Sequence, residues 1–517
     1  MTTDIELTPA KKDVALPEIL SPEGSLKDAS ASSVGEIYKR RNILECLRYY
    51  EAILDHKLGV ESQGPERVLP ENRQPPKLWY MFVIWASSGT FGLGNFSIGT
   101  LGWSYGLSLG QTIPIMMFGI LLGCMTAAWC GTLGPATGLR QISVSRYSMG
   151  WWPTKIVAIF NIFGLIGFAS VQCITAGQGL SAVSGYSLSI LVGIVIVTVL
   201  ALVIGFGGYR ILLVIEAYFW VPFFLLTLIL FGETGDKVSL QQPATASGMK
   251  FTAAVLNLLA SSYGCTSIFC SWISDYFVHY PADISRVKVY FLTMFGMWIA
   301  NFVGVLPGCL IGSVLAQNAS LAAAYDAHGI GEVMLRLMYP SGFAKFVMVI
   351  FSLGGIGFGA IAIYSAALAV QQLAAPLQMV PHFFWSLASF AGLMVLSIVG
   401  KTAVPTFLSN ILALVGYFNT IYFAILFTEH VLFRRGKITN YDLDGWNNRS
   451  RLPVGYAGFG AFVAGWVGSV LGMVSSFYVG VIAERIGGGD VANMLGLVFA
   501  LVSYPPLRYL ELLFCGR

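Results

Sequence analysis

An amide and an aromatic ring stand one helical turn apart inside a long apolar run, GLIGFASVQCITAGQGL, from Gly164 to Leu180. Phe168 and Gln172 are four residues apart, so a helix would present both side chains on one face. In hydrocarbon, the carbonyl oxygen and the NH2 group of a glutamine both need partners, because leaving them unpaired costs free energy. The partner is either a group on another helix or a ligand that arrives from water.

Few ionisable groups lie in or beside the apolar runs, and such groups are candidates for function by default. They are Glu216, Asp275 and Glu429 with its neighbour His430. For Glu216 and Asp275, proton coupling and pairing with a nearby arginine both stay open. For Glu429, pairing with a basic residue such as Arg434 is the favoured interpretation.

The composition indicates a protein that crosses a membrane many times. Of the 517 residues, 56% are hydrophobic and only 11% are charged, and the mean hydropathy is +0.71, whereas soluble proteins carry about 25% charged residues. This excludes an ordinary water-soluble enzyme. The net charge of +4 predicts no nucleic-acid partner. The five histidines and eight cysteines show no metal-ligand spacing, so we expect no metal and no cofactor.

Because a helix needs about 20 apolar residues to cross the hydrocarbon, the sequence predicts twelve spans. Their predicted ranges are 80–102, 110–133, 153–178, 187–207, 211–231, 252–273, 289–315, 344–371, 383–400, 405–428, 455–480 and 489–507. Eleven lysines and arginines fall in the loops on one side and six on the other. The positive-inside rule then predicts that both termini are cytosolic. The triplet at Asn318 would lie outside, where Asn318 could be glycosylated.

Glycine and hydroxyl residues mark two of these spans. Span 1 reads WASSGTFGLGNFSIGTLGW, and span 6 reads ASSYGCTSIFCSWISDYF. The two spans are five helices apart, as the broken helices of a five-plus-five inverted repeat would be, and unwound backbone in such helices supplies binding groups at mid-membrane. The glycines of span 8 are explained by close helix packing alone. The pattern therefore favours a transporter over a membrane enzyme or channel.

Several segments resemble the fungal purine-cytosine permeases of the nucleobase-cation symport family. They include GLRQISVSRYSMG (138–150), SDYFVHYP (274–281), GYFNTIYFAILFTEHVLFRR (416–435) and the terminal YPPLRYLELLFCGR. The resemblance runs from about Gly59 to Arg517. The GWW at 150–152 and the YPP near the end are similar to the vitamin B6 permease branch of that family.

The resemblance implies an all-α integral membrane protein with twelve transmembrane helices, in a leucine-transporter-type 5+5 inverted repeat plus two C-terminal helices. The expected parts are a polar, partly disordered cytosolic tail (1–78), a transport core (79–428, with repeats at about 79–232 and 251–428), a basic cytosolic loop (429–453) and the two extra helices (454–517). It also implies uptake of a nucleobase (purine or cytosine) or a related small nitrogen heterocycle at the plasma membrane, coupled to protons.

The resemblance assigns the substrate site to spans 1, 3, 6 and 8. The stacking aromatic and amide of span 3 fall on Phe168 and Gln172, the second stacking aromatic falls on Phe269, and a Trp-x-Ser pattern in span 1 falls on Trp85 and Ser87.

Span 8 departs from the family pattern, since Phe358, Gly359 and Ala362 stand where relatives carry asparagines. Because a mismatched polar group left unpaired costs about 1–3 kcal/mol, we expect a roomier, less polar site and a substrate with a different or smaller polar edge than cytosine.

The composition of span 8 also bears on the ion that drives transport. Sodium needs several oxygen ligands, and the span 8 stretch GGIGFGAI (354–361) has no hydroxyl, so we expect proton symport with Glu216 or Asp275 as candidate carriers. Two alternatives stay open: a carrier of vitamin B6 or of a secondary metabolite, and a non-transporting nutrient sensor with the same fold. The direction of transport also stays open.

Overall fold

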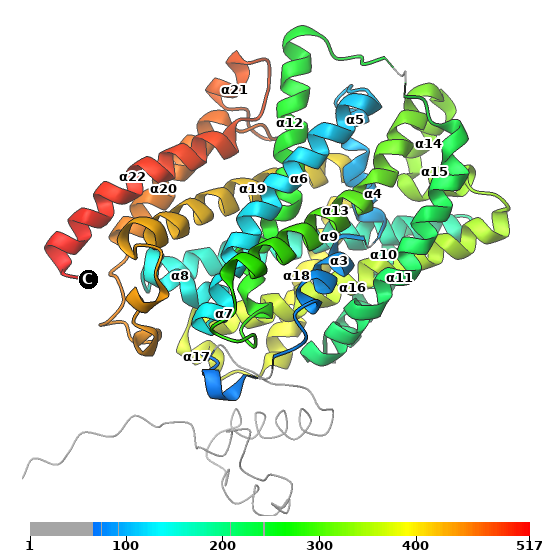
Figure 1. Cartoon of the computed structure of the whole chain (residues 1–517). Coiled ribbons are helices and arrows are strands. Elements are labelled where there is room, and N and C mark those ends of the chain that lie inside the picture. Colours follow the sequence, from blue (N-terminus) through cyan, green and yellow to red (C-terminus); the bar gives the residue numbers. More distant parts are fainter. Residues whose placement is uncertain (1–65, 74, 91, 207, 241–242) are drawn as a thin grey trace, which may run out of the picture.

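The protein, here as a computed structural model, is a bundle of helices (Figure 1). The structure describes residues 66–517 except 74, 91, 207 and 241–242, and it describes no side chain at 86–90, 208–217, 219 and 375. In this part of the chain the β-structure consists of one isolated bridge between Val474 and Val479. Most of the predicted tail (1–78) lies outside the described residues.

The predicted spans all fall on helices. In chain order these are α3 (Tyr80–Thr90) with α4 (Leu93–Gly99) and α5 (Leu101–Ser104), α6 (Leu109–Gly131), α9 (Pro153–Val183), α10 (Ile190–Phe206), α11 (Gly208–Thr234), α12 (Gly248–Ser267), α13 (Arg286–Gln317), α16 (Ser341–Leu373), α18 (His382–Gly400), α19 (Val404–Thr428), α20 (Tyr456–Gly472) and α22 (Ala492–Cys515). Within the described residues, eight helices are long and apolar enough to cross a membrane, and α10 and α20 are shorter apolar helices.

Short helices connect these spans. They are η2 (Pro70–Asn72), α7 (Leu133–Thr137), α8 (Gln141–Met149), η3 (Gly235–Lys237), η4 (Ile268–Ser271), η5 (Ile273–Tyr276), α14 (Ala319–His328), α15 (Ile330–Leu337), α17 (Ala375–Gln378), η6 (Glu429–Phe433), η7 (Ile438–Asn440), η8 (Leu443–Gly445) and α21 (Val481–Arg485). The cap of α14 is Asn318, whose exposed side chain accepts the backbone N–H groups of Ser320 and Leu321 through its carbonyl oxygen. Its NH2 group takes no part in the cap, and glycosylation there stays a prediction.

Spans 1 and 6 are both discontinuous, as their composition predicts. In span 1, α3 ends at Thr90 and α4 begins at Leu93, and Gly92 has a φ of +88°, a conformation that glycine adopts without a steric penalty. In span 6, α12 ends at Ser267 and the chain continues as the tighter turns of η4 and η5.

The last two spans differ in length from the prediction. Span 11 ends at Gly472, and an extended segment follows it to Gly480. Span 12 continues through Pro505 and Pro506 to Cys515, although proline normally interrupts a helix. The reason lies beyond the prolines, where Arg508 and Glu511 are buried in ionic contacts that hold the last turns in place.

Those contacts form an ionic cluster around Glu429, which directly follows α19 and is fully buried. Its two carboxylate oxygens accept from Arg434 Nε at 2.8 Å and from Arg508 Nε at 3.2 Å. Glu511 pairs with Arg508 at 3.0 Å and also accepts the N–H of Gly455, directly before α20. The expected pairing of Glu429 is therefore confirmed, and the cluster joins the end of α19 to both extra helices.

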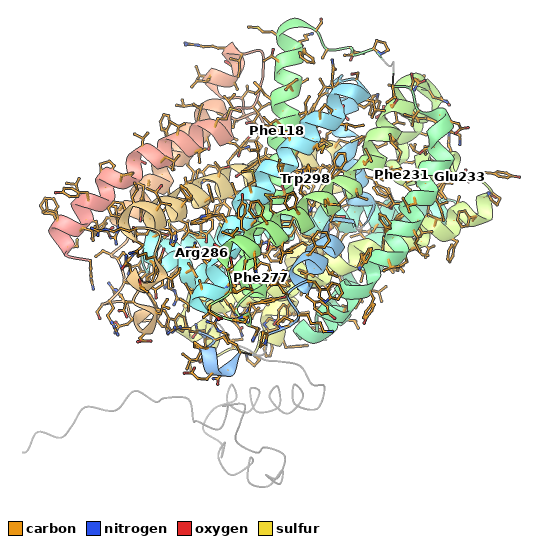
Figure 2. All side chains as sticks on the ribbon, in the orientation of Figure 1. Phe118, Phe231, Glu233, Phe277, Arg286 and Trp298 are labelled. Carbon is orange, nitrogen blue, oxygen red and sulfur yellow. The ribbon has the colours of Figure 1, made fainter. Side chains whose placement is uncertain are left out.

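Side chains fill the space between the helices (Figure 2). Phe277, one of the labelled residues, is fully buried and stands edge-on to Trp85, with ring centroids 6.0 Å apart. At the start of α13, Arg286 donates to Thr132 Oγ1 and to the carbonyl of Gly436, and it contacts His430. These contacts tie the segment after span 6 to spans 1, 2 and 10.

Candidate functional site

Gln172 lies on α9 and faces the break in span 1. Its side chain is 3% exposed, and its Nε2 donates to Asn95 Oδ1 at 2.9 Å. Its Oε1 is buried and has no hydrogen-bond partner. A Cβ at Gly94 would lie 2.2 Å from this oxygen, so glycine there leaves the room that the amide occupies. One half of the amide is therefore held by the protein, and the other half keeps its capacity to accept a hydrogen bond.

The first aromatic wall joins spans 3 and 8. Phe168 and Phe358 are both buried, and their rings meet edge-to-face with centroids 5.0 Å apart. Phe358 stands at one of the positions where asparagines were expected from the family. A phenyl ring, and no amide, therefore lines this side, and the expectation of a roomier, less polar site stays a prediction.

The second aromatic wall joins the two broken spans. Trp85 of α3 is 1% exposed and lies edge-on to Phe269 of η4, with ring centroids 5.3 Å apart. Phe269 also contacts Trp272 at 5.1 Å, and the buried indole Nε1 of Trp272 has no hydrogen-bond partner. The tight turns of η4 place both rings where span 6 leaves its regular helix.

The two walls meet around α9. This helix packs against α4, α16 and η4, which carry Asn95, Phe358 and Phe269. Four of the five predicted substrate residues are thus buried side chains of one core, and none points into lipid: Phe168, Gln172, Phe269 and Trp85. The fifth, Ser87, lies on α3, but its side chain is outside the described part. We call these residues with Asn95 and Phe358 the central site.

Glycines of span 8 let α16 approach this site closely. A Cβ at Gly354 would lie 2.8 Å from the Cα of Gly92, and one at Gly355 would lie 2.7 Å from the backbone oxygen of Gln172. Any larger residue would push α16 away from the break in span 1. Close packing therefore accounts for Gly354 and Gly355, as expected, whereas a Cβ at Gly357 would meet nothing within 4 Å.

Of the two candidate carboxylates, the structure describes the side chain of Asp275 only. Asp275, in η5 beyond the end of span 6, accepts the backbone N–H of Gln141 at 2.8 Å. Burial raises the pKa of Asp275 to about 6, while the nearby Arg140 and the bond from Gln141 oppose that rise. Glu216 lies in α11, but its side chain is outside the described residues. In the described part of the chain, no group of three or more His, Cys, Asp or Glu could hold a metal ion.

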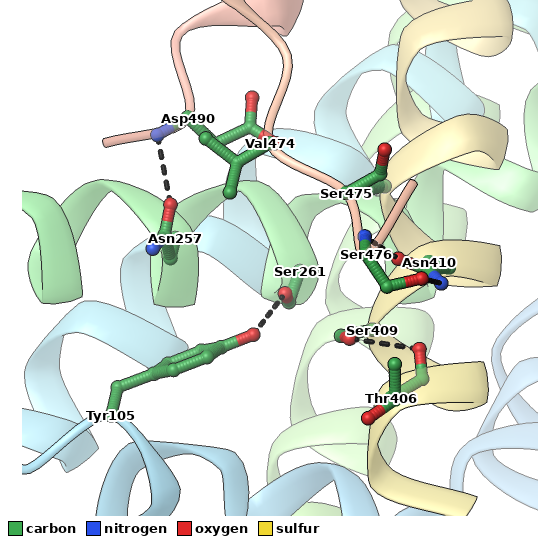
Figure 3. A pocket seen from close by; sticks show the side chains of 11 residues that line it. Tyr105, Asn257, Ser261, Thr406, Ser409, Asn410, Val474, Ser475, Ser476 and Asp490 are labelled. Atoms are coloured by element: carbon green, nitrogen blue, oxygen red, sulfur yellow. Dashed lines mark hydrogen bonds between the residues drawn. The ribbon is translucent and has the colours of Figure 1, made fainter. Parts of the chain in front are cut away.

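A separate cavity of about 280 Å³ lies at the end of the bundle where α12, the start of α19 and the loop before α22 meet (Figure 3). We call it the Tyr105 pocket, and its lining residues are Tyr105, Asn257, Ser261, Thr406, Ser409, Asn410, Ala413, Val474, Ser475, Ser476 and Asp490. None of them belongs to the central site. No pattern in the sequence predicts this pocket.

Comparison with known proteins places this arrangement among transporters. The family model described as permease for cytosine/purines, uracil, thiamine, allantoin matches residues 68–496. The chain is 31% identical to the vitamin B6 transporter of Saccharomyces cerevisiae, covering 89% of each protein. It is also 31% identical to the purine-cytosine permease fcyB of Emericella nidulans, covering 89% of this chain and 91% of that protein.

A solved structure has the same fold. It is Mhp1, a nucleobase-cation-symport-1 family transporter in a closed conformation with bromovinylhydantoin bound. The TM-score is 0.65 at 15% identity, and the match covers 88% of this chain and 96% of that one. The fold is therefore the all-α, leucine-transporter-type arrangement that the resemblance implies. Together with the family match, it makes this chain a multi-pass secondary transporter, not an enzyme, that belongs to the family of permeases for cytosine/purines, uracil, thiamine and allantoin.

Proposed function

We propose that the chain takes up a small, flat nitrogen heterocycle at the plasma membrane, with both termini in the cytosol. The ring class is that of purines and cytosine or a close relative. The observation that carries the proposal is the buried, unpartnered Oε1 of Gln172 beside the break in span 1. An N–H or O–H on the edge of a bound ring would supply the missing hydrogen bond, and a buried acceptor is costly without one.

The aromatic walls support a planar substrate. Phe168 and Phe269 each stand edge-on to a second ring, which fixes their orientation. Flat rings pack on such faces with a gain of about 0.5–1.5 kcal/mol beyond burial. Ser87 and Trp85 would complete the side formed by span 1.

Uptake of labelled cytosine, adenine, hypoxanthine and pyridoxine tests the proposal in a yeast strain without its own permeases for these compounds. Saturable uptake of at least one ring is expected. No uptake of any of them by protein present at the cell surface would contradict it. Binding without counterflow in reconstituted vesicles would instead identify a non-transporting sensor.

A vitamin B6-type substrate is the second candidate, and one observation favours it. Phe358 puts a ring where an amide would read the polar edge of cytosine. Sequence identity does not separate the two candidates, because it is 31% both to the vitamin B6 transporter and to the purine-cytosine permease fcyB. Competition of unlabelled pyridoxine, thiamine, cytosine and adenine against one labelled substrate separates the candidates. Micromolar uptake of cytosine would rule out the expectation that the substrate has a different or smaller polar edge than cytosine.

Proton coupling is the proposed driving force, with no cofactor. Within span 8, residues 354–361 offer no hydroxyl for sodium. Asp275 is partly buried, and the burial of its carboxyl group raises its pKa to about 6, near the range where it would exchange protons. Uptake should rise as external pH falls and should collapse with a protonophore, and Asp275→Asn should flatten that pH dependence. Uptake indifferent to both treatments would exclude proton symport.

A further inference from the structure

The Tyr105 pocket draws its walls from five separate parts of the chain. Tyr105 follows α5, Asn257 and Ser261 lie on α12, residues 406–413 lie on α19, and Val474 to Ser476 and Asp490 come from the loops around α21. Figure 3 shows the hydroxyl of Tyr105 directed toward Ser261, and the two oxygens are 3.4 Å apart. The lining thus brings one aromatic ring together with two amides and several hydroxyls.

Hydrogen bonds fix the polar side chains around this pocket. The buried carboxylate of Asp490 accepts the hydroxyl of Tyr417 and the backbone N–H of Ala492, while its own N–H donates to Asn257 Oδ1 at 2.8 Å. On the opposite side, Asn410 donates to Ser476 Oγ at 2.7 Å and accepts that residue's N–H. These bonds orient the polar side chains before any ligand binds, which lowers the entropy cost of binding.

Charge and size restrict what the pocket can hold. Asp490 is the only charged residue among the eleven that line it, so an anion would meet a carboxylate with no basic group to offset it. A volume of about 280 Å³ lies just below the range of small-molecule sites, about 300–1,000 Å³. It suits one small ring system rather than an extended ligand.

We propose that the Tyr105 pocket is a second binding subsite, distinct from the central site, for a small neutral or positively charged ring that carries hydrogen-bond donors. The ring class rests on the proposed function. In the proposed orientation the pocket faces the cell exterior, so a substrate would occupy it before it reaches the central site. Tyr105 supplies a ring face, Asn257 and Asn410 border the edge, and Asp490 excludes anions.

Cysteine protection in intact cells tests the subsite without relying on transport. Ser409 lines the pocket and is partly exposed. Of the eight native cysteines, six are buried, Cys515 lies at the opposite end and Cys46 is outside the described residues. Ser409→Cys, combined with Gln172→Ala to disable the central site, is labelled with a membrane-impermeant thiol reagent. Cytosine, adenine, pyridoxine, thiamine and the anion urate are added one at a time. Ser187→Cys, in an exposed loop at the same end, is the matched control, and the chain without an introduced cysteine gives the background.

The expected result is labelling of Ser409→Cys that at least one neutral or cationic ring slows, by about twofold when its concentration equals its Kd. Urate should have no effect, and no ring should change labelling of Ser187→Cys. Protection that disappears in the Gln172→Ala background would trace the effect to the central site and overturn the proposal. Failure of Ser409→Cys to react, with Thr406→Cys also unreactive, or equal protection by urate, would overturn it too. Failure of the proposed function is a separate result, namely no uptake by the unmodified chain.

Discussion

The central site and the Tyr105 pocket differ in the kind of side chain that forms them. The central site combines two buried pairs of aromatic rings with one amide pair, Gln172 and Asn95. Around Tyr105, amides, hydroxyls and one carboxylate dominate. A buried acceptor without a partner discriminates strongly between ligands, whereas a wetter site lined by groups that already bond one another discriminates weakly. We infer that selection of the substrate belongs to the first region and capture to the second.

The largest effect should come from Gln172→Ala. Removing the amide takes away about 1–3 kcal/mol of binding, so initial uptake should fall by roughly 5- to 150-fold. Gln178→Ala is the control, because Gln178 is a buried glutamine of the same helix outside the site. The measurement is initial uptake at matched surface expression. Equal losses in both variants, or a loss of surface protein, would mean that Gln172 only supports the fold.

Phe358→Asn should sharpen the contrast by returning an amide to span 8. Uptake of cytosine relative to pyridoxine should rise about tenfold, the change that one added polar contact gives. Phe358→Leu removes the ring without adding a hydrogen-bonding group, and it should leave that ratio unchanged. If both variants shift the ratio alike, the volume of Phe358 and not its lack of polarity sets the preference.

Asp490→Asn removes the charge from the Tyr105 pocket and should change how the stability of the protein depends on pH. Burial raises the pKa of Asp490 to about 6, against the pull of its bond from Tyr417. The folded protein therefore binds a proton more tightly than the unfolded chain, so stability falls as pH rises from about 4 to 6 and stays lower above 6. Because the cavity is open to water, we expect this loss of folding stability to be about 1 kcal/mol. Thermal unfolding in detergent at pH 5 and 7.5 should show a smaller difference for the variant, and an unchanged difference would contradict this assignment.

The smallest effect should come from Ser409→Leu, which fills part of the pocket. A capture site adds uniform binding, so KM should rise about threefold with the maximal rate unchanged. Ser187→Leu, outside the pocket, serves as the comparison. A fall in the maximal rate at constant KM would point instead to impaired movement of α19.

The sequence predicted more of the central site than of the Tyr105 pocket. Glycines with hydroxyls correctly indicated breaks in spans 1 and 6, because unwound backbone has a local compositional signature. The spacing of Phe168 and Gln172 on one face also followed from local geometry. The partner of Gln172 could not be found this way, since Asn95 is 77 residues away. The contact of Phe358 with Phe168 could not be found this way either, and it places a ring where the family pattern has an amide.

The Tyr105 pocket was still harder to foresee. Its residues come from positions as far apart as 105 and 490, and each alone resembles an ordinary loop or helix end. The predicted end of span 11 at residue 480 also hid the extended segment after Gly472, which forms one wall. Long-range packing, and not local propensity, decides such a cavity.

The ionic cluster at Glu429 has a mechanical consequence for α19. At that end the buried Glu429 pairs with Arg508 of α22, and Glu511 joins Arg508 to the start of α20. Breaking this cluster would leave an unpaired charge in the interior. At its other end the ties to the loops between the extra helices are a neutral amide–serine pair and one tyrosine hydroxyl. A rod pinned firmly at one end and lightly at the other pivots about the firm end. Swinging of α19 should thus be widest beside Ser409 and Asn410.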